Sequence, residues 1–350
     1  MKRPRNGRTT ANAAALLAGL LLLAGMAATA RGEEKDEKRV LEVGKWYPTL
    51  EAGLSMTQSS YSNNWRGGDK GSVVWTALAQ GGAENQLHPK VNWNNSLRLA
   101  FGQTHQQQDR VGTHNRYWAG PIKSADLLDF ESLVRFTLGA WVDPFFGVRA
   151  ESQFLDAADA DGRSLRFNPW RFQEAAGVAR KWVDEKDRNY QSRLGFTFRQ
   201  GLRRYHANPA PDKTTKSEMT NDGGFEFVTD AKTSVLSKRV AWTSKLTLYQ
   251  PVFYSGKADL QDAGFAALAA HTMALDADFE NLFTSQITKI LSVQLYTRWL
   301  YDQYDNSVKP VFKDLNAPTA GEELALRNAA VRKAGQFKQT LGIGLTYRFL

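Results

Sequence analysis

Apolar and polar residues alternate along most of the chain between residues 45 and 349. In residues 337–349, an apolar series that includes Leu341 and Ile343 is interleaved with a polar series that includes Lys338. Residues 91–101 show the same pattern. A period of two is typical of a β-strand with one apolar face, and its repeats predict about twelve strands. The weaker of these lie near residues 71–80, 146–155, 172–182 and 223–234.

The lengths of the predicted strands and of their connections indicate a membrane barrel. Many strands approach the roughly nine to eleven residues of a tilted membrane-spanning strand. We expect connections of roughly 12, 9, 23, 5, 14, 6, 18, 4, 20, 5 and 34 residues, an alternation that matches the short periplasmic turns and long external loops of outer-membrane barrels. The sequence therefore predicts an all-β fold, a single antiparallel transmembrane β-barrel over residues 45–350. The competing prediction is a soluble periplasmic β-protein.

The polar faces of these strands carry charges of both signs. A charged side chain of Arg or Lys costs about 2–4 kcal/mol at the lipid-facing midplane of a barrel, so this face is expected to line a wet lumen. The lumen-facing candidates are Arg98, Glu131, Arg135, Arg149, Glu151, Arg193, Arg199, Lys245, Asp276, Asp278, Arg298 and Lys338.

Aromatic residues gather near both predicted ends of the barrel, where two girdles at the membrane interfaces are expected. Near the periplasmic end are Trp46, Tyr47, Trp93, Trp141, Trp182, Tyr190, Trp242 and Phe349. Near the external end are Trp65, Trp118, Trp170, Phe253, Tyr254, Trp299 and Tyr301. Two Ala-rich stretches, residues 257–271 and 316–336, are expected to form short helices in external loops.

The first predicted external connection contains a compact polar motif. It consists of Asn64, Trp65, Arg66, Gly67, Gly68 and Asp69. Asn and Gly tolerate positive φ and suit a tight hairpin, with the tryptophan anchoring its end at the interface. The alternative interpretation is a ligand site formed by the Asn, Trp, Arg and Asp of this motif.

The N-terminal sequence has the layout of a signal peptide. Four basic residues precede an apolar run over residues 13–27 and the small residues of 28–30, and that run is short of the roughly 20 residues of a spanning helix. We therefore predict a signal peptide over residues 1–30, with a membrane anchor as the alternative, and a charged segment over 31–44. Loss of four basic residues and no acidic ones would lower the formal charge from +9 to +5.

Composition narrows the chemistry further. The chain has no cysteine, which excludes disulfides, thiolate metal sites and a lipid-modified cysteine. The sequence has no basic cluster with interleaved aromatic residues, which is the pattern that would indicate nucleic-acid binding. The five histidines form no metal-binding pair, and no G-x-S-x-G elbow occurs. The acidic residues Asp156, Asp159 and Asp161 lack EF-hand spacing. We predict no catalytic residue, no cofactor and no metal site.

Several segments resemble one family. LEAGLSMTQSSYSNNWRGGDKGSV, TSKLTLYQPVF, YTRWLYDQYDNSV and GQFKQTLGIGLTYRFL are similar to segments of the domain of unknown function 3078 family, predicted outer-membrane barrel proteins of Gram-negative bacteria. The resemblance extends over most of residues 45–349. It implies an outer-membrane location and a barrel fold, and it supplies no catalytic residues. One departure is that Leu350 follows Phe349, whereas barrels of this type usually end on an aromatic residue.

These observations lead to a functional hypothesis with alternatives. A barrel of about twelve strands is wider than barrels whose interior is filled by side chains and narrower than barrels that leave a wide channel. We expect a narrow channel for small polar or anionic solutes in the outer membrane. The first alternative is a plugged barrel whose external loops recognise lipopolysaccharide or a partner, and the second is a barrel lipid hydrolase. Expected partners are outer-membrane lipid, lipopolysaccharide and the barrel-assembly machinery, without nucleic acid.

Overall fold

The computed structural model of the protein describes residues 41–59, 70–111, 116–157, 159, 161–185, 188–236, 239–262, 266–288, 290–304 and 334–348. The predicted signal peptide, most of the charged segment, the hairpin motif with Trp65, and nearly all of the second predicted helical stretch lie outside the described residues. Phe349 and Leu350 also lie outside them.

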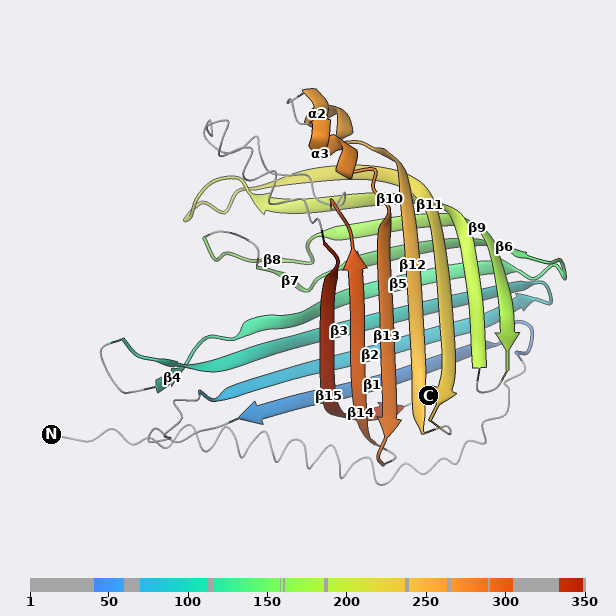
Figure 1. The fold of residues 1–350 in the computed structure, drawn as a ribbon, viewed down its shortest axis with the longest axis horizontal. Helices are drawn as coiled ribbons and strands as arrows, with labels where there is room; N and C mark the ends of the chain where they lie inside the picture. The colour runs from blue at the N-terminus through green and yellow to red at the C-terminus, as the bar shows by residue number, and fades with distance from the viewer. Residues whose placement is uncertain are drawn as a thin grey trace. The chain divides into compact units, whose positions relative to one another are not determined.

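Twelve long strands in the described part of the chain form one antiparallel barrel (Figure 1). They are β1 (Trp46–Ser59), β2 (Ser72–His88), β3 (Val91–Asp109), β5 (Ile122–Phe136), β6 (Asp143–Ser152), β9 (Trp170–Asp184), β10 (Arg188–His206), β11 (Thr215–Val235), β12 (Val240–Tyr254), β13 (Asp276–Gln286), β14 (Leu291–Tyr301) and β15 (Gln336–Arg348). Shorter strands are β4 (Arg116–Trp118), β7 (Leu155–Asp156) and β8 (Leu165–Arg166). The predicted number of barrel strands is confirmed.

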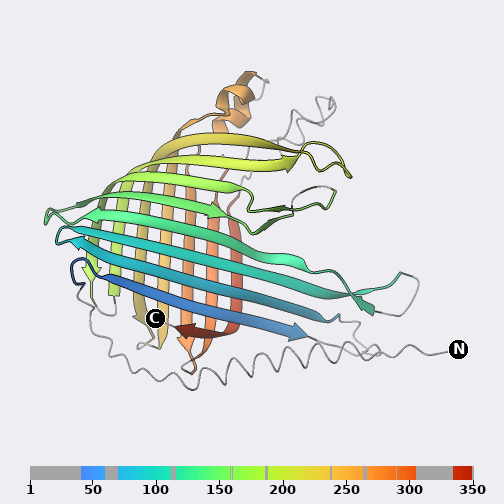
Figure 2. The ribbon, with the colours of Figure 1, turned by 180° about the vertical axis from the view of Figure 1, so that it is seen from behind.

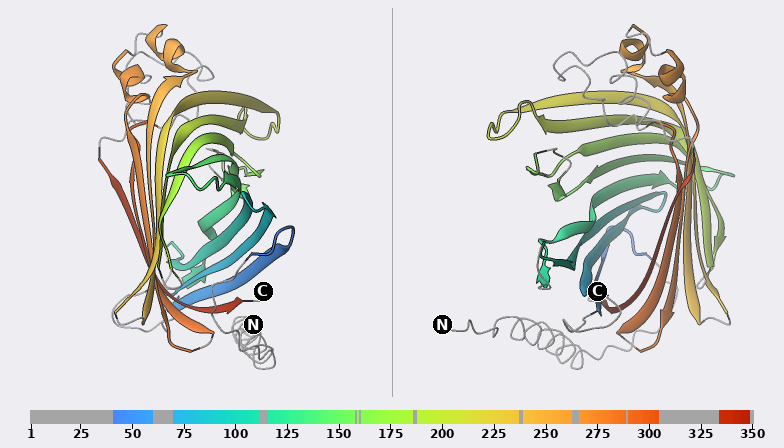
Figure 3. Two further views of the ribbon diagram at one scale, coloured as in Figure 1. Left: turned by 90° about the vertical axis from the view of Figure 1, so that its right-hand side faces the viewer. Right: turned by 60° about the vertical axis from the view of Figure 1, so that its left-hand side comes forward.

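The barrel closes because β1 pairs with both β2 and β15. Ala52 lies opposite Ala79 of β2 and Tyr347 of β15, and β2 continues the sheet by pairing with β3. Seen from opposite sides, β12–β15 cross β1–β5 steeply (Figure 1, Figure 2). Figure 3 shows these two groups as facing walls. The seam is short, because β1 and β15 pair only over Glu51–Ser55, and residues 336–343 of β15 pair with β14 alone within the described part of the chain.

Connections of two kinds alternate around the barrel. One end, here called the turn end, carries the short connections 89–90, 137–142, 185–187, 236–239 and 287–290. The other, the loop end, carries the connections 60–71, 110–121, 153–169, 207–214, 255–275 and 302–335. The predicted alternation is therefore confirmed, with short turns at one end and longer loops at the other.

Three of the predicted connection lengths are wrong. The connection between β2 and β3 is only residues 89–90, that between β3 and β5 is 110–121, and that between β10 and β11 is 207–214. In these places the strands continue past the apolar alternation into stretches that are polar on both faces, such as residues 103–109. Strand pairing continues there through backbone hydrogen bonds, which leave no apolar signal in the sequence.

The faces of the barrel have the polarity of a membrane protein. Large apolar side chains lie exposed on the outer face, among them Leu194 (52% exposed), Phe225 (57%) and Leu341 (68%). Polar side chains are buried within the described residues, including Asp129 and Asp222 at 3% exposure each. Such an arrangement would be unfavourable in water, where each exposed large apolar side chain forgoes about 1.5–3 kcal/mol of burial. It matches a barrel with hydrocarbon outside and polar groups inside.

Tryptophans at the turn end are tied to neighbouring strands. The indole Nε1 of Trp93 donates a hydrogen bond to Ser132 Oγ at 2.9 Å, and that of Trp242 donates to Asn281 Oδ1 at 3.1 Å. An indole that is apolar on its ring and polar at one edge suits the boundary between hydrocarbon and headgroups. These bonds fix the rings against the barrel wall at the turn end.

The loop end carries two short helices, as predicted for residues 257–271. They are α2 (Lys257–Asp262) and α3 (Ala266–His271), which extend beyond β12 (Figure 1). A small core forms where Tyr254 packs with Leu260, Ala269 and Tyr304. Tyr254 is only 5% exposed, because residues of α2 and α3 cover its ring. The prediction that it belongs to the aromatic girdle near the external end is therefore wrong. No helix of the described residues is long and apolar enough to cross a membrane.

Candidate functional site

Charged side chains from strands that are not neighbours in the sheet contact one another inside the barrel. Glu131 of β5 accepts a hydrogen bond from Arg193 Nη1 of β10 at 2.9 Å. Arg199 of β10 lies 3.6 Å from Asp276 of β13. Neither pair of strands is adjacent in the sheet, because β6 and β9 separate the first and β11 and β12 the second. Contacts of this kind can form only through the lumen.

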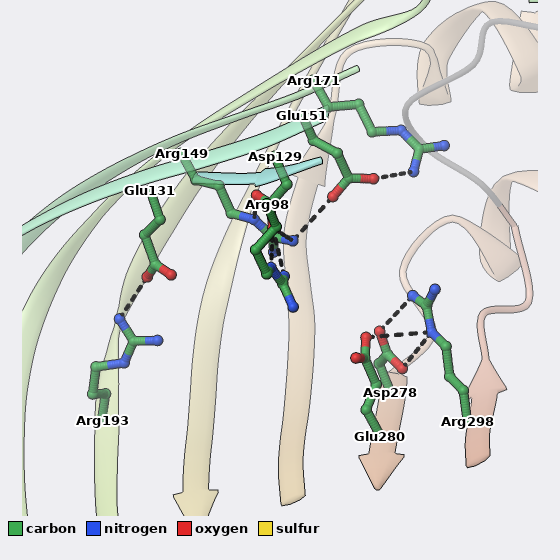
Figure 4. Close-up of polar contacts among 10 residues, drawn as sticks. All are labelled: Arg98, Asp129, Glu131, Arg149, Glu151, Arg171, Arg193, Asp278, Glu280 and Arg298. Atoms are coloured by element: carbon green, nitrogen blue, oxygen red, sulfur yellow. Dashed lines mark hydrogen bonds and ion pairs between the residues drawn. The ribbon is translucent and has the colours of Figure 1, made fainter. Parts of the chain in front are cut away.

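Asp129 is the centre of the tightest cluster in the lumen (Figure 4). Its Oδ2 accepts hydrogen bonds from Arg98 Nε at 2.8 Å and Nη2 at 2.5 Å. Arg149 Nε donates to its Oδ1 at 2.7 Å, and Arg149 Nη2 reaches Glu151 at 3.1 Å. Arg171 continues the chain of charges at 3.9 Å from Glu151. One almost fully buried carboxylate therefore holds two guanidinium groups in place.

A second cluster lies on the wall formed by β13 and β14 (Figure 4). Arg298 donates from Nε to Asp278 Oδ1 at 2.9 Å and from Nη2 to Asp278 Oδ2 at 2.6 Å. Its Nε is also 3.6 Å from Glu280. This two-pronged geometry matches the flat fork of a guanidinium to a carboxylate and fixes both side chains.

A cavity of about 250 Å³ lies between these clusters. Its charged lining comprises Arg98, Arg149, Glu151, Arg171, Arg199, Asp222, Glu226, Lys245, Asp276, Asp278, Glu280, Arg298 and Asp302. Six of these are basic and seven are acidic. The cavity therefore presents a mixed surface, in which neither sign of charge dominates.

A second, smaller cavity lies beside the pair of Glu131 and Arg193. It measures about 40 Å³. Phe145 and Val228 line it at 6% and 4% exposure, and the guanidinium carbon of Arg193 lies 5.8 Å from the centre of the Phe145 ring. Lys245 lines both this cavity and the larger one. This layer, here called the constriction, is formed by Glu131, Arg193, Phe145 and Val228.

Tyr249 of β12 belongs to the polar network that lines the larger cavity. Its hydroxyl donates a hydrogen bond to Asp222 Oδ2 at 2.8 Å, and the guanidinium carbon of Arg199 lies 3.2 Å from its ring centre. Only 1% of Tyr249 is exposed. A cation over an aromatic face is attracted by the electrons of the ring, so Tyr249 positions Arg199 as well as Asp222.

The structure brings most of the predicted lumen candidates into these clusters. Outside them, Arg135 lies 3.9 Å from Asp143, and Lys338 is exposed opposite Arg298 in the pairing of β14 with β15. The prediction omitted Arg171, Asp222 and Glu226, all of which line the larger cavity. The sequence contained a signal for Asp222 and Glu226, because they share one face of β11, whereas apolar Phe225 and Phe227 lie on the other.

Two of the acidic loop residues that lack EF-hand spacing, Asp159 and Asp161, pair with Arg163. Arg163 Nε donates to Asp159 Oδ2 and its Nη2 to Asp159 Oδ1, both at 2.9 Å. Its Nη1 donates to the carbonyl oxygens of Asn208, at 2.9 Å, and Asp212, at 2.5 Å. Arg163 thus joins the loop after β6 to the loop after β10. Among the residues that the structure describes, no cluster of side chains is suited to a metal ion.

Replacing Arg163 with glutamine is expected to release this clasp and to speed thermolysin cleavage near Leu165 several-fold. The hydrogen bond from Arg163 lowers the pKa of Asp159 from 3.8 to about 2. The clasp should therefore persist above about pH 4 and be lost as the pH falls through about 2, where the carboxylate takes up a proton. Arg166→Gln, which alters an exposed side chain of the same loop, is the control. Equal cleavage of wild type and Arg163→Gln would contradict the clasp.

The chain aligns with several solved outer-membrane proteins. An outer membrane channel from Pseudomonas putida F1 is 11% identical, with a TM-score of 0.40 over 91% of this chain and 100% of that chain. The translocator domain of the autotransporter NalP from Neisseria meningitidis is 8% identical, with a TM-score of 0.34 over 97% and 98%. An anion-selective porin from Comamonas acidovorans is 9% identical, with a TM-score of 0.29 over 87% and 100%. At scores this low, the alignments establish neither a shared substrate nor a shared role.

Sequence comparison gives a more specific result for one segment. No curated protein is significantly similar to the chain. Residues 56–157, which run from within β1 to the loop after β6, match the model of a family described as Protein of unknown function (DUF3078). The resemblance to that family, predicted from the sequence, is therefore confirmed over residues 56–157.

Proposed function

We propose that the protein resides in the outer membrane and that its lumen is a narrow passage for small polar solutes. The closed barrel with apolar side chains outside and charged ones inside supports the membrane location. The observation that carries the proposal of a passage is the cavity of about 250 Å³ lined by charged groups from β3 to β14. Charged walls hold water, which a polar solute needs along its path.

The constriction sets the size limit of this passage. Glu131 and Arg193 bridge β5 and β10 across part of the interior with a 2.9 Å hydrogen bond, and the space beside them is about 40 Å³. The balanced charge of the larger cavity favours weak discrimination between anions and cations. We therefore propose small neutral or zwitterionic solutes in preference to the anionic ones expected from the sequence.

Removing both partners of the cross-barrel pair is expected to raise single-channel conductance several-fold in planar bilayers. The Glu131→Ala, Arg193→Ala double variant removes the hydrogen bond that crosses the lumen without leaving either charge unpaired. Arg188→Ala is the control, because this side chain is 64% exposed at the turn end, 3.9 Å from Glu185. Unchanged conductance in the double variant, with the control also unchanged, would refute the assigned constriction.

The small cavity at the constriction also supports a second candidate, a plugged barrel that acts through its loops. In that case the wild-type protein gives no current, and lipopolysaccharide binds to it in solution. A steady wild-type current would exclude this candidate. We propose no enzymatic role, and release of fatty acid from detergent-solubilised phospholipid by the purified protein would contradict that.

A further inference from the structure

Arg180 occupies an unusual place for a charged residue, on the outer face of β9 at the turn end. In the pairing of β9 with β10 it lies opposite Ser192, on the face that also carries Val178 and Trp182. Its guanidinium carbon lies 4.6 Å from the ring centre of Trp141 and 4.8 Å from that of Trp182. The two indoles meet edge to face with their ring centres 6.4 Å apart, and both contact the cation.

The protein holds this guanidinium in place without neutralising it. Arg180 Nη1 donates a hydrogen bond to the carbonyl oxygen of Trp141 at 2.7 Å. Trp182 is itself fixed, since its Nε1 donates to Ser192 Oγ at 3.0 Å. Within the described ranges, no carboxylate forms an ion pair with Arg180, and its Nε is buried without a hydrogen-bond partner. The charge is thus positioned and still unpaired.

A groove of about 390 Å³ opens beside this cation. Gly139, Ala140, Trp141, Asp143, Ala179, Arg180 and Lys181 line it. Asp143 lies 3.9 Å from Arg135, and Lys181 lies 3.4 Å from Asp184, so each of these charges has a partner of its own. Small residues at 139 and 140 leave the groove open, and Arg180 supplies its unpaired positive charge.

The location indicates what neutralises that charge. Interfacial tryptophans mark the level at which hydrocarbon meets headgroups, and short turns face the periplasm in outer-membrane barrels. At that level the abundant anion is the phosphodiester of a phospholipid, whose two free oxygens can accept hydrogen bonds from the terminal N–H groups of the guanidinium that Trp141 leaves free. A cation that merely reached into water would not require two rings to hold it against the barrel wall.

We propose that Arg180, held against Trp141 and Trp182, binds the phosphodiester of a phospholipid in the periplasmic leaflet. This inference rests on the membrane location proposed above and is independent of conduction. The acyl chains would lie along the apolar outer face beside Val178, and the headgroup would occupy the groove. The site is therefore a lipid site on the outside of the barrel, separate from the lumen.

Native mass spectrometry of the full-length protein with added phosphatidylglycerol tests the proposal. Loss of a hydrogen bond between charged groups weakens binding about tenfold, so Arg180→Gln is expected to bind this lipid about tenfold more weakly than wild type. Arg180→Lys keeps the charge without the fork, and it should bind more tightly than Arg180→Gln and less tightly than wild type. Arg188→Gln removes another turn-end arginine that has an acidic partner, and it should bind like wild type.

Three results would overturn the proposal. The first is equal phosphatidylglycerol binding by Arg180→Gln and wild type, as expected if the side chain only reaches water. The second is equal binding of diacylglycerol, which lacks the phosphate. The third is binding of inorganic phosphate as tight as that of the lipid, which would leave an anion site and no lipid site. A wild-type protein that binds the lipid but carries no current would refute the channel while supporting this site.

Discussion

Replacing Asp129 with alanine is expected to lower the free energy of unfolding by about 3–5 kcal/mol, the cost of breaking a buried ion pair by removing one partner. The carboxylate is 3% exposed and accepts hydrogen bonds from both Arg98 and Arg149. Without it, two guanidinium groups would face each other across a vacated space. Glu151 can compensate only one of them, since it lies 3.1 Å from Arg149 and no contact joins it to Arg98.

Urea titration of the protein in lipid vesicles, followed by tryptophan fluorescence, measures this loss. Asp184→Ala is the matched control, because its side chain is 43% exposed and pairs with Lys181 at 3.4 Å. An exposed pair of this kind contributes about 0–1 kcal/mol. Adding Arg98→Ala to Asp129→Ala should restore part of the stability by removing one uncompensated charge. A change below about 1 kcal/mol for Asp129→Ala would show that water already screens the cluster.

The barrel could be predicted from the sequence because its driving force is local. Each strand alternates between hydrocarbon and lumen. In β10, for example, Leu194 and Phe196 are exposed outside, whereas Thr197, which follows Phe196, is buried inside. The alternation of short and long connections then supplies the topology. The ends of β2, β10 and β11 could not be located, because beyond the hydrocarbon both faces of a strand are polar while its backbone pairing continues.

The site could be predicted only as a list of side chains on one face. Periodicity placed Glu131 and Arg193 on polar faces, but their contact depends on the tilt and stagger with which β5 and β10 close the barrel. No sequence spacing encodes that geometry. Arg171 was missed because it stands at the start of β9, where the alternation is weak. The clamp around Arg180 was also missed, because Trp141 belongs to a turn and has no strand register.

Phe196→Arg is expected to lower the free energy of unfolding in vesicles by about 2–4 kcal/mol, the cost of a basic side chain at the lipid-facing midplane of a barrel. Phe196 is 40% exposed on β10, and its ring lies 5.8 Å from that of Phe225 in an edge-to-face contact. Its partners in the adjacent strands are Ala176 and Phe225, so no carboxylate opposite it could neutralise the new charge.

Two matched variants separate the charge from the lost ring. Phe196→Leu removes the aromatic contact alone, which contributes about 0.5–1.5 kcal/mol beyond its area. Thr247→Arg adds the same charge to the lumen opposite Asp278, where water and a carboxylate are within reach, and it should cost less than about 1 kcal/mol. If Thr247→Arg proved more destabilising than Phe196→Arg, the outer face would be the wetter of the two. In that case the hydrocarbon would not lie where the exposed phenylalanines of β10 and β11 place it.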